Sequence, residues 1–315
     1  MSPIIEVHDL VKRYRLAETN AVDGISFDVA PGSFFALLGP NGAGKTTTIS
    51  ILTTTLAPTG GTVRVAGHDV VDAAADVRRS VGIIFQNPSL DMNLTAEENV
   101  RFHAVLYGLY PFRPTYRLMP GEYRQRIEHL ATVLGIQDDI FKPIRTFSGG
   151  MKRKLEILRS LIHKPRVLFL DEPTAGLDPV SRRNLWEYLG QVRQESGTTV
   201  FLTTHYLEEA EAVDLVCVIN HGRVVTLGTP AAIKAELAPA YLLVDAAAGD
   251  RERLRAELAG HRVEVPADAP VPYRIPLDGR DIHAFLRSIE TPLTLVRTHT
   301  PSLEDAYLHI VGYEA

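Results

Sequence analysis

Short apolar runs alternate with longer amphipathic stretches along most of the chain. Runs of β-branched, aromatic and leucine residues predict strands at residues 4–7, 26–29, 34–38, 61–65, 81–85, 167–170, 199–203, 215–219 and 223–227. The turn Asn220-His221-Gly222 predicts a hairpin between the last two. Short buried strands separated by helical patterns are typical of a mainly parallel sheet covered by helices. The pattern therefore predicts an α/β fold.

Two regions depart from this alternation. Residues 94–161 are helical in pattern throughout, which predicts a helical subdomain inserted between core strands. Within it, residues 110–121 are rich in proline and aromatic residues, and we interpret them as an exposed loop or as a contact surface for a partner. From residue 238 the predicted order is strand, helix, strand, strand, helix, strand and helix, at 241–245, 250–258, 262–265, 273–277, 280–289, 293–298 and 302–311. The first six follow the order of a ferredoxin-like α+β module, so we expect domains at 1–237 and 238–315.

One segment between a predicted strand and a predicted helix has the pattern of a phosphate-binding loop. Its glycines let the backbone approach an anion closely, and the start of the following helix favours negative charge. Lys45 is expected to reach the β- and γ-phosphates of a nucleoside triphosphate, and Thr46 to offer its hydroxyl to Mg²⁺. The pattern comprises Gly39, Pro40, Asn41, Gly42, Ala43, Gly44, Lys45 and Thr46, and Thr47 follows it in the predicted nucleotide site.

A second segment places two carboxylates at the end of a buried strand. Asp171 and Glu172 follow the apolar run 167–170, at the sheet edge where α/β proteins place their ligands. We expect Asp171 to belong to the Mg²⁺ shell and Glu172 to polarise a water that attacks the γ-phosphate. The two segments together predict hydrolysis of a nucleotide.

A third segment, Ser148-Gly149-Gly150, precedes an amphipathic helix. Ser148 suits the N-cap, and the two glycines leave room for an anion at the helix end. Because residues 39–46 are already expected to hold the chain's own nucleotide, we expect this second anion site to face a second nucleotide. Lys152-Arg153-Lys154 follows in the same helix, and we interpret this run as a solvated face or as an attraction for phosphate or an acidic partner.

Composition restricts the partners and the compartment. The 315 residues carry 33 basic and 38 acidic side chains, a net charge of -5 that argues against nucleic acid as the main partner. The single cysteine, Cys217, lies in an apolar run and is expected to be a buried thiol. No signal-peptide pattern and no apolar run long enough to span a bilayer is present, so any membrane-spanning part is expected to belong to another polypeptide.

These motifs together resemble the ATP-binding-cassette (ABC) ATPases over residues 4–237. The resemblance implies a P-loop ATPase core with a mainly parallel sheet, an antiparallel β edge and the inserted helical subdomain, followed by the ferredoxin-like module. It implies ATP and Mg²⁺ as ligands, Glu172 and His205 as catalytic residues, and a signature segment at Ser148, Gly149 and Gly150, where Met151 replaces a common glutamine. It further assigns Gln86 to Mg²⁺ and nucleotide contact, Tyr14 to stacking on adenine, and Asp178 to the loop that crosses a dimer interface.

Residues 85–91 and 300–308 look like the bacterial exporter branch, which includes daunorubicin-type drug-resistance pumps. This resemblance implies an ATPase subunit at the cytoplasmic face of the cell membrane, working with separate polytopic permease subunits. Its other partner is a second copy of itself or a homologous ATPase subunit. The alternative is a soluble ABC ATPase with a regulatory role outside transport. A P-loop kinase or GTPase would lack the signature segment and His205.

Overall fold

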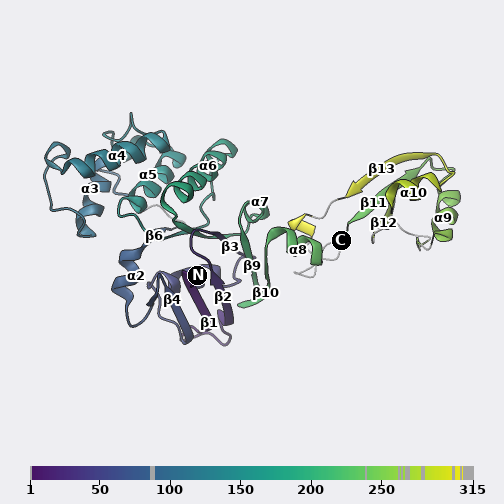
Figure 1. Ribbon diagram of the computed structural model, residues 1–315, viewed down its shortest axis with the longest axis horizontal. Coiled ribbons are helices and arrows are strands. Elements are labelled where there is room, and N and C mark those ends of the chain that lie inside the picture. The colour runs from purple at the N-terminus through teal and green to yellow at the C-terminus, as the bar shows by residue number, and fades with distance from the viewer. Residues whose placement is uncertain are drawn as a thin grey trace. The chain divides into compact units, whose positions relative to one another are not determined.

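Residues 1–229 and 230–315 form two separate units in the computed structural model of the protein (Figure 1). The structure describes residues 2–85, 89–237, 240–261, 263, 265–266, 270–277, 281–299, 302–305 and 307. The division between the units precedes helix α8 (Pro230–Leu237), whereas the predicted boundary followed that helix. Within the described ranges, no helix combines the length and the apolarity that crossing a bilayer requires.

The first unit is built on a six-stranded sheet with the order β10-β9-β3-β8-β7-β6. All neighbouring strands are parallel except β10, which pairs antiparallel with β9 at one edge. Every residue of β3, β7 and β8 is buried, as expected for central strands covered on both faces. The strands are β3 (Phe34–Leu38), β6 (Val81–Ile84), β7 (Val167–Asp171), β8 (Thr199–Thr204), β9 (Leu215–Asn220) and β10 (Arg223–Gly228). The predicted mainly parallel sheet and its terminal hairpin are confirmed.

A second sheet is antiparallel and has the order β2-β1-β4-β5. Its strands are β1 (Ile5–Lys12), β2 (Val22–Val29), β4 (Gly60–Val65) and β5 (His68–Asp69). The main core lies between the two sheets, where the ring of Phe35 stacks on Phe27 and on Phe201 with centroids 5.1 and 5.0 Å apart. This aromatic contact joins the antiparallel sheet to the centre of the parallel one.

Helices cover the parallel sheet and also form a subdomain of their own. Figure 1 shows β3 and β6 between the helices α3–α6 on one side and β1, β2 and β4 on the other. The helices of the first unit are α1 (Lys45–Leu52), α2 (Ala74–Ser80), α3 (Ala96–Leu106), α4 (Gly121–Leu134), α5 (Gly149–Leu161), α6 (Pro179–Ser196) and α7 (Leu207–Glu211). The described residues between β6 and β7 form α3, α4, α5 and two short 3₁₀ turns, Tyr116–Leu118 and Ile144–Thr146, and this confirms the predicted helical insertion.

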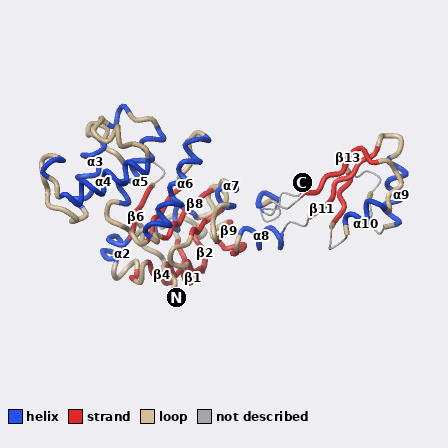
Figure 2. Tube along the Cα trace, turned by 45° about the horizontal axis from the view of Figure 1, so that its top comes forward, coloured by secondary structure: helices blue, strands red, loops and turns tan. Residues whose placement is uncertain are grey.

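The second unit has its own three-stranded antiparallel sheet with the order β12-β11-β13, which Figure 2 shows in red. After α8 its elements are β11 (Tyr241–Ala246), α9 (Arg251–Gly260), β12 (Tyr273–Pro276), α10 (Ile282–Arg287) and β13 (Leu293–His299). Helices α9 and α10 pack on the apolar face of the sheet, where Leu242 and Val244 are buried with Leu254 and Leu258.

Two predicted elements of this unit differ from the structure or lie partly outside it. Of the strand expected at 262–265, Val263 and Val265 are described and belong to no strand. Residues 262 and 264 lie outside the described residues. Of the helix expected at 302–311, residues 303–305 and 307 are helical, and 308–311 lie outside the described part. The order strand, helix, strand, helix, strand of the described elements agrees with the remaining predictions.

Candidate nucleotide site

The segment 39–46 forms the turn between β3 and helix α1. Gly44 is the N-cap of α1 and has a φ of 104°. A Cβ atom at this position would lie 2.5 Å from the carbonyl oxygen of Ala21, so only glycine fits without moving the backbone. The first turn of α1 contains no acidic side chain, and its first amide groups have no partner within the helix. The turn therefore offers backbone donors and a favourable dipole to an anion.

Lys45 brings a cation into this turn although it is only 5% exposed. Its Nζ donates to the carbonyl oxygens of Gly39 at 2.7 Å and Pro40 at 3.0 Å. It also lies 4.0 Å from Oε1 of Glu172. Burial lowers the pKa of Lys45 below its ordinary value, and the carboxylates of Glu172 and Asp171 act in the opposite direction. The ammonium group is thus held in the turn by main-chain oxygens.

A cavity of about 580 Å³ opens beside this turn. It brings together residues from the phosphate loop, from the end of β7 and from the end of β8. Its lining is Ala21, Asn41, Gly42, Gly44, Lys45, Thr46, Thr47, Glu172, Ala175 and His205. Glycine backbone, one buried cation and several hydroxyls suit the triphosphate of ATP, and the volume is of the size of common ligand pockets.

Asp171 lies at the end of β7 and is 4% exposed. Its Oδ1 accepts a hydrogen bond of 2.5 Å from the hydroxyl of Thr203 on β8. Burial raises the pKa of the Asp171 carboxyl, and the hydrogen bond from Thr203 opposes this rise. The described residues contain no group of three His, Cys, Asp or Glu side chains that would hold a metal alone. Mg²⁺ needs few protein ligands when phosphate oxygens supply the others, so Thr46 and Asp171 fit it as partners of a bound nucleotide.

Glu172 has a backbone conformation that is rare for its residue type, with a φ of 46°. Its amide donates both to the carbonyl oxygen of Thr203 at 3.1 Å and to the hydroxyl of Thr203 at 3.2 Å. Its carboxylate Oε1 lies 3.1 Å from Nδ1 of His205, which directly follows β8. The structure thus brings the two predicted catalytic residues into contact at the wall of the cavity. Strained conformations of this kind are concentrated at functional sites.

Tyr14 lies beside the start of helix α1. Its hydroxyl is 3.2 Å from Oγ1 of Thr47, and the side chain is 45% exposed. The ammonium of Lys12 is 5.7 Å from the centre of the ring. The exposed ring next to the phosphate loop leaves an aromatic surface for a base.

Among the residues that the structure describes, the predicted signature residues Ser148, Gly149 and Gly150 and the predicted interface residue Asp178 do not line the cavity. Ser148 is the N-cap of α5 and accepts a hydrogen bond of 3.2 Å from the amide of Met151, as expected. Asp178 caps α6 and accepts from the amides of Val180 and Ser181, both at 3.0 Å. Ser148, Gly149 and Asp178 are exposed. Gln86, predicted to contact Mg²⁺, lies outside the described residues.

The structure also shows polar residues near the site that the sequence did not single out. Thr203 contacts both Asp171 and Glu172. Arg153, interpreted above as part of a solvated or phosphate-attracting run, is 7% exposed and donates to main-chain oxygens and to Glu156. The interpretation as a solvated face is therefore wrong for Arg153. The signal that could have found it is Glu156, an acid three residues later on the same face of the helix.

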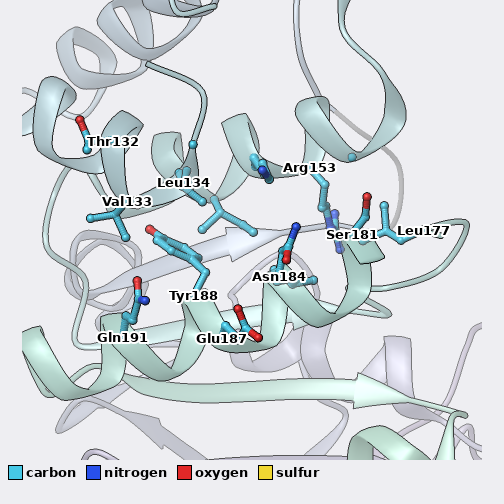
Figure 3. Close-up of a pocket in the computed structure, with 15 residues that line it drawn as sticks. Thr132, Val133, Leu134, Arg153, Leu177, Ser181, Asn184, Glu187, Tyr188 and Gln191 are labelled. Carbon is cyan, nitrogen blue, oxygen red and sulfur yellow. The ribbon is translucent and has the colours of Figure 1, made fainter. Parts of the chain in front are cut away.

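A second cavity, of about 260 Å³, lies between α4, α5 and α6 and contains no residue of the phosphate loop (Figure 3). Figure 3 shows Tyr188 reaching from α6 toward Val133 and Leu134 of α4, while Arg153 extends from α5. This cavity lies where the helical subdomain meets α6, and its lining includes Leu177, two residues after Ala175 of the nucleotide cavity.

Comparisons with known proteins agree with this arrangement. The family model described as ABC transporter matches residues 22–175. The chain is 38% identical over 319 residues to the daunorubicin/doxorubicin resistance ATP-binding protein DrrA of Streptomyces peucetius, covering 99% of this chain and 93% of that protein. It is also 38% identical to the Nod factor export ATP-binding protein I of Ralstonia nicotianae, covering 99% and 95%. The solved structure of cbiO1 from Clostridium perfringens, part of the ABC transporter complex cbiONQ, has a TM-score of 0.66 at 30% identity, covering 75% of this chain and 92% of that one.

Proposed function

The chain belongs to the ABC transporter family and is the ATP-binding, ATP-hydrolysing subunit of an export pump, and we propose that it drives efflux through separate membrane subunits by ATP-dependent closure of a dimer. The observation that carries this proposal is the cavity in which the phosphate loop faces Glu172 and His205. The full-length similarity to export ATPases supports the direction of transport.

We assign the hydrolytic roles from the contacts of the side chains. Lys45 lines the cavity, and its charge stabilises the β- and γ-phosphates of a nucleotide bound there. Glu172 accepts a proton from the attacking water, whose oxygen forms a bond to the γ-phosphorus as the bond to the β–γ bridging oxygen breaks. His205, 3.1 Å from Glu172, orients that carboxylate. Bound Mg²⁺, held by Thr46 and Asp171 together with the phosphates, would neutralise charge on the nucleotide.

We further propose that two nucleotides are sandwiched between two cassettes. Ser148 and Gly149 are exposed at the N-terminus of α5 and are absent from the lining of the chain's own phosphate cavity. The end of α5 therefore has donors available for the γ-phosphate held by a second copy or by a homologous subunit. Closure of the dimer would then depend on the γ-phosphate, and hydrolysis would allow the dimer to open. We propose the same interface for Asp178, which is exposed at the N-cap of α6.

The exposed apolar side chains of the helical subdomain are the proposed contact for a membrane subunit. Phe102 is 38%, Leu106 84% and Phe112 54% exposed, and the rings of Phe102 and Phe112 stack with centroids 6.2 Å apart. Arg101 holds the loop that carries Phe112 through a hydrogen bond of 2.7 Å to the carbonyl oxygen of Arg113. Apolar exposure of this kind favours a protein interface. Docking here would hold the chain peripherally at the cytoplasmic face of the membrane.

Two variants test the hydrolytic cycle. Glu172→Gln should lower ATP turnover at least 100-fold, of the order seen when a catalytic proton acceptor is removed, while ATP binding remains and the closed dimer accumulates. Ser148→Arg should also stop turnover, because the long arginine side chain would keep the N-terminus of α5 from the second nucleotide. ATP should still bind to the phosphate loop of the same chain. Normal hydrolysis by Glu172→Gln would remove that residue from the proposed role.

Co-purification tests the transport assignment. A tagged chain purified from detergent-solubilised membranes of its own cells should retain a polytopic membrane protein, and Phe112→Asp should release it. An active chain that retains no membrane protein would favour the alternative, a regulatory ATPase that does not take part in transport.

A further inference from the structure

Arg153 is a buried cation that connects the helical subdomain to the end of the central strand β7. It belongs to helix α5, whose N-cap is Ser148. Its Nε donates to the carbonyl oxygen of Pro173 at 3.0 Å, and its NH2 group donates to that of Asp171 at 3.4 Å. These two carbonyls belong to the residues immediately before and after Glu172. One guanidinium group therefore binds the backbone on both sides of the proposed proton acceptor.

The backbone of Glu172 needs such support because its conformation is strained. A φ of 46° is unfavourable for a residue with a side chain and persists where the surroundings hold it in place. Thr203 of β8 holds the amide of Glu172 from the sheet. Arg153 holds the neighbouring carbonyls from the helical subdomain. The position of the Glu172 carboxylate thus depends on two parts of the first unit.

The same guanidinium also binds the end of a second strand, β6. Its NH1 group donates to the carbonyl oxygen of Phe85, just after β6, at 2.6 Å and to Oε2 of Glu156 at 3.2 Å. Glu156 is 1% exposed and accepts a hydrogen bond of 3.0 Å from the amide of Ser89. The buried charge of Arg153 is therefore balanced, and every contact uses the planar fork of donors that only arginine has.

We propose that Arg153 is a positioning residue for ATP hydrolysis, which fixes the backbone around Glu172 and makes the placement of its carboxylate depend on helix α5. The inference rests on the role proposed for Glu172. Because Ser148 caps the start of α5, a second nucleotide bound at that end of the helix would act on Glu172 through the side chain of Arg153. Arg153 is absent from the lining of the phosphate cavity, so its effect falls on hydrolysis and not on ATP affinity.

Steady-state kinetics of the full chain test this assignment. Arg153→Met keeps the length of the side chain and removes its donors, and it should lower kcat about 100-fold, of the order expected when a reacting group is misplaced by about 1 Å. Arg153→Lys retains the charge without the fork and should lower kcat about 10-fold. The KM for ATP and the affinity for a fluorescent ATP analogue should change less than about threefold in both. Lys154→Met, the next residue of the helix, removes a charge of the same sign and should retain the wild-type kcat.

A double-mutant cycle separates positioning from a general loss of structure. In a Glu172→Gln background, single-turnover hydrolysis should fall less than about threefold further when Arg153→Met is added, because the group that Arg153 positions no longer accepts a proton. A further 100-fold loss in that background, or a wild-type kcat for both Arg153 variants, would overturn the proposal. Should Arg153→Met fail to fold, Arg153→Lys and its double variant serve the same comparison. Failure of the proposed function itself would look different, since Glu172→Gln alone would then hydrolyse ATP normally.

Discussion

Replacing Gly44 by alanine should destabilise the phosphate loop even without a nucleotide. Gly44 has a φ of 104°, and its added Cβ would lie 2.5 Å from the carbonyl oxygen of Ala21, where carbon–oxygen contacts normally begin near 3.3 Å. The carbonyl oxygen of Ala21 would have to move away from the added Cβ by about 0.8 Å. Val22, the next residue, is buried at the start of β2, so the backbone resists this movement. Backbone strain of about 1 kcal/mol and overpacking of about 2 kcal/mol together predict a loss of about 3 kcal/mol in the free energy of unfolding.

Gly42→Ala is the matched control in the same loop. Gly42 also has a positive φ, of 81°, but no heavy atom lies within 4 Å of its added Cβ. Only backbone strain remains, so the expected loss is about 1 kcal/mol. Urea unfolding followed by tryptophan fluorescence measures both variants, because the single tryptophan, Trp186, packs on Phe34 in the first unit with ring centroids 6.1 Å apart. Equal losses for the two variants would refute the close approach at Gly44 as the reason for glycine there.

Three further predictions concern single side chains. Burial raises the pKa of Cys217 to about 12, so iodoacetamide at pH 8 should label the thiol only after unfolding, and rapid labelling of the folded protein would show that the thiol is accessible. Burial raises the folded-state pKa of Asp171, so its ionisation opposes folding above that pKa and has no effect below the unfolded value near 3.8. Asp171→Asn should therefore raise the melting temperature by about 2 °C at pH 8 and leave it unchanged at pH 3.5. A gain at both pH values would argue against the buried charge as the cause. Tyr14→Ala should weaken ATP binding about 10-fold and leave tripolyphosphate binding unchanged, whereas Tyr14→Phe retains the ring; equal weakening of both ligands would contradict stacking on the base.

The sequence predicted best the elements whose burial is uniform. The parallel strands β3, β7 and β8 are apolar runs buried along their whole length, so their positions were predicted to within one residue. Strand β1 was predicted too short, at 4–7, because it continues through Asp9, a polar residue with a φ of 49° where the register of the pairing shifts. The alternation of apolar and polar residues does not reveal such a shift in the pairing of two strands.

The candidate site shows a similar division. The phosphate loop and Glu172 could be predicted from local motifs and His205 from the family resemblance, and the structure places them around one cavity. The contribution of Arg153 could not be predicted, since it bonds mainly to main-chain oxygens distant in the sequence, and any residue type supplies such oxygens. Thr203 was part of a predicted strand, but its contacts with Asp171 and Glu172 depend on the pairing of β7 with β8.

The central claim is that two cassettes close on ATP and that hydrolysis opens them. Analytical ultracentrifugation of the Glu172→Gln protein tests it most directly, because that variant should bind ATP without consuming it. We expect a dimer with saturating ATP and Mg²⁺, a monomer with ADP, and a monomer with ATP when Ser148→Arg is added. A Glu172→Gln protein that binds ATP at full occupancy and sediments as a monomer at every concentration would contradict the account.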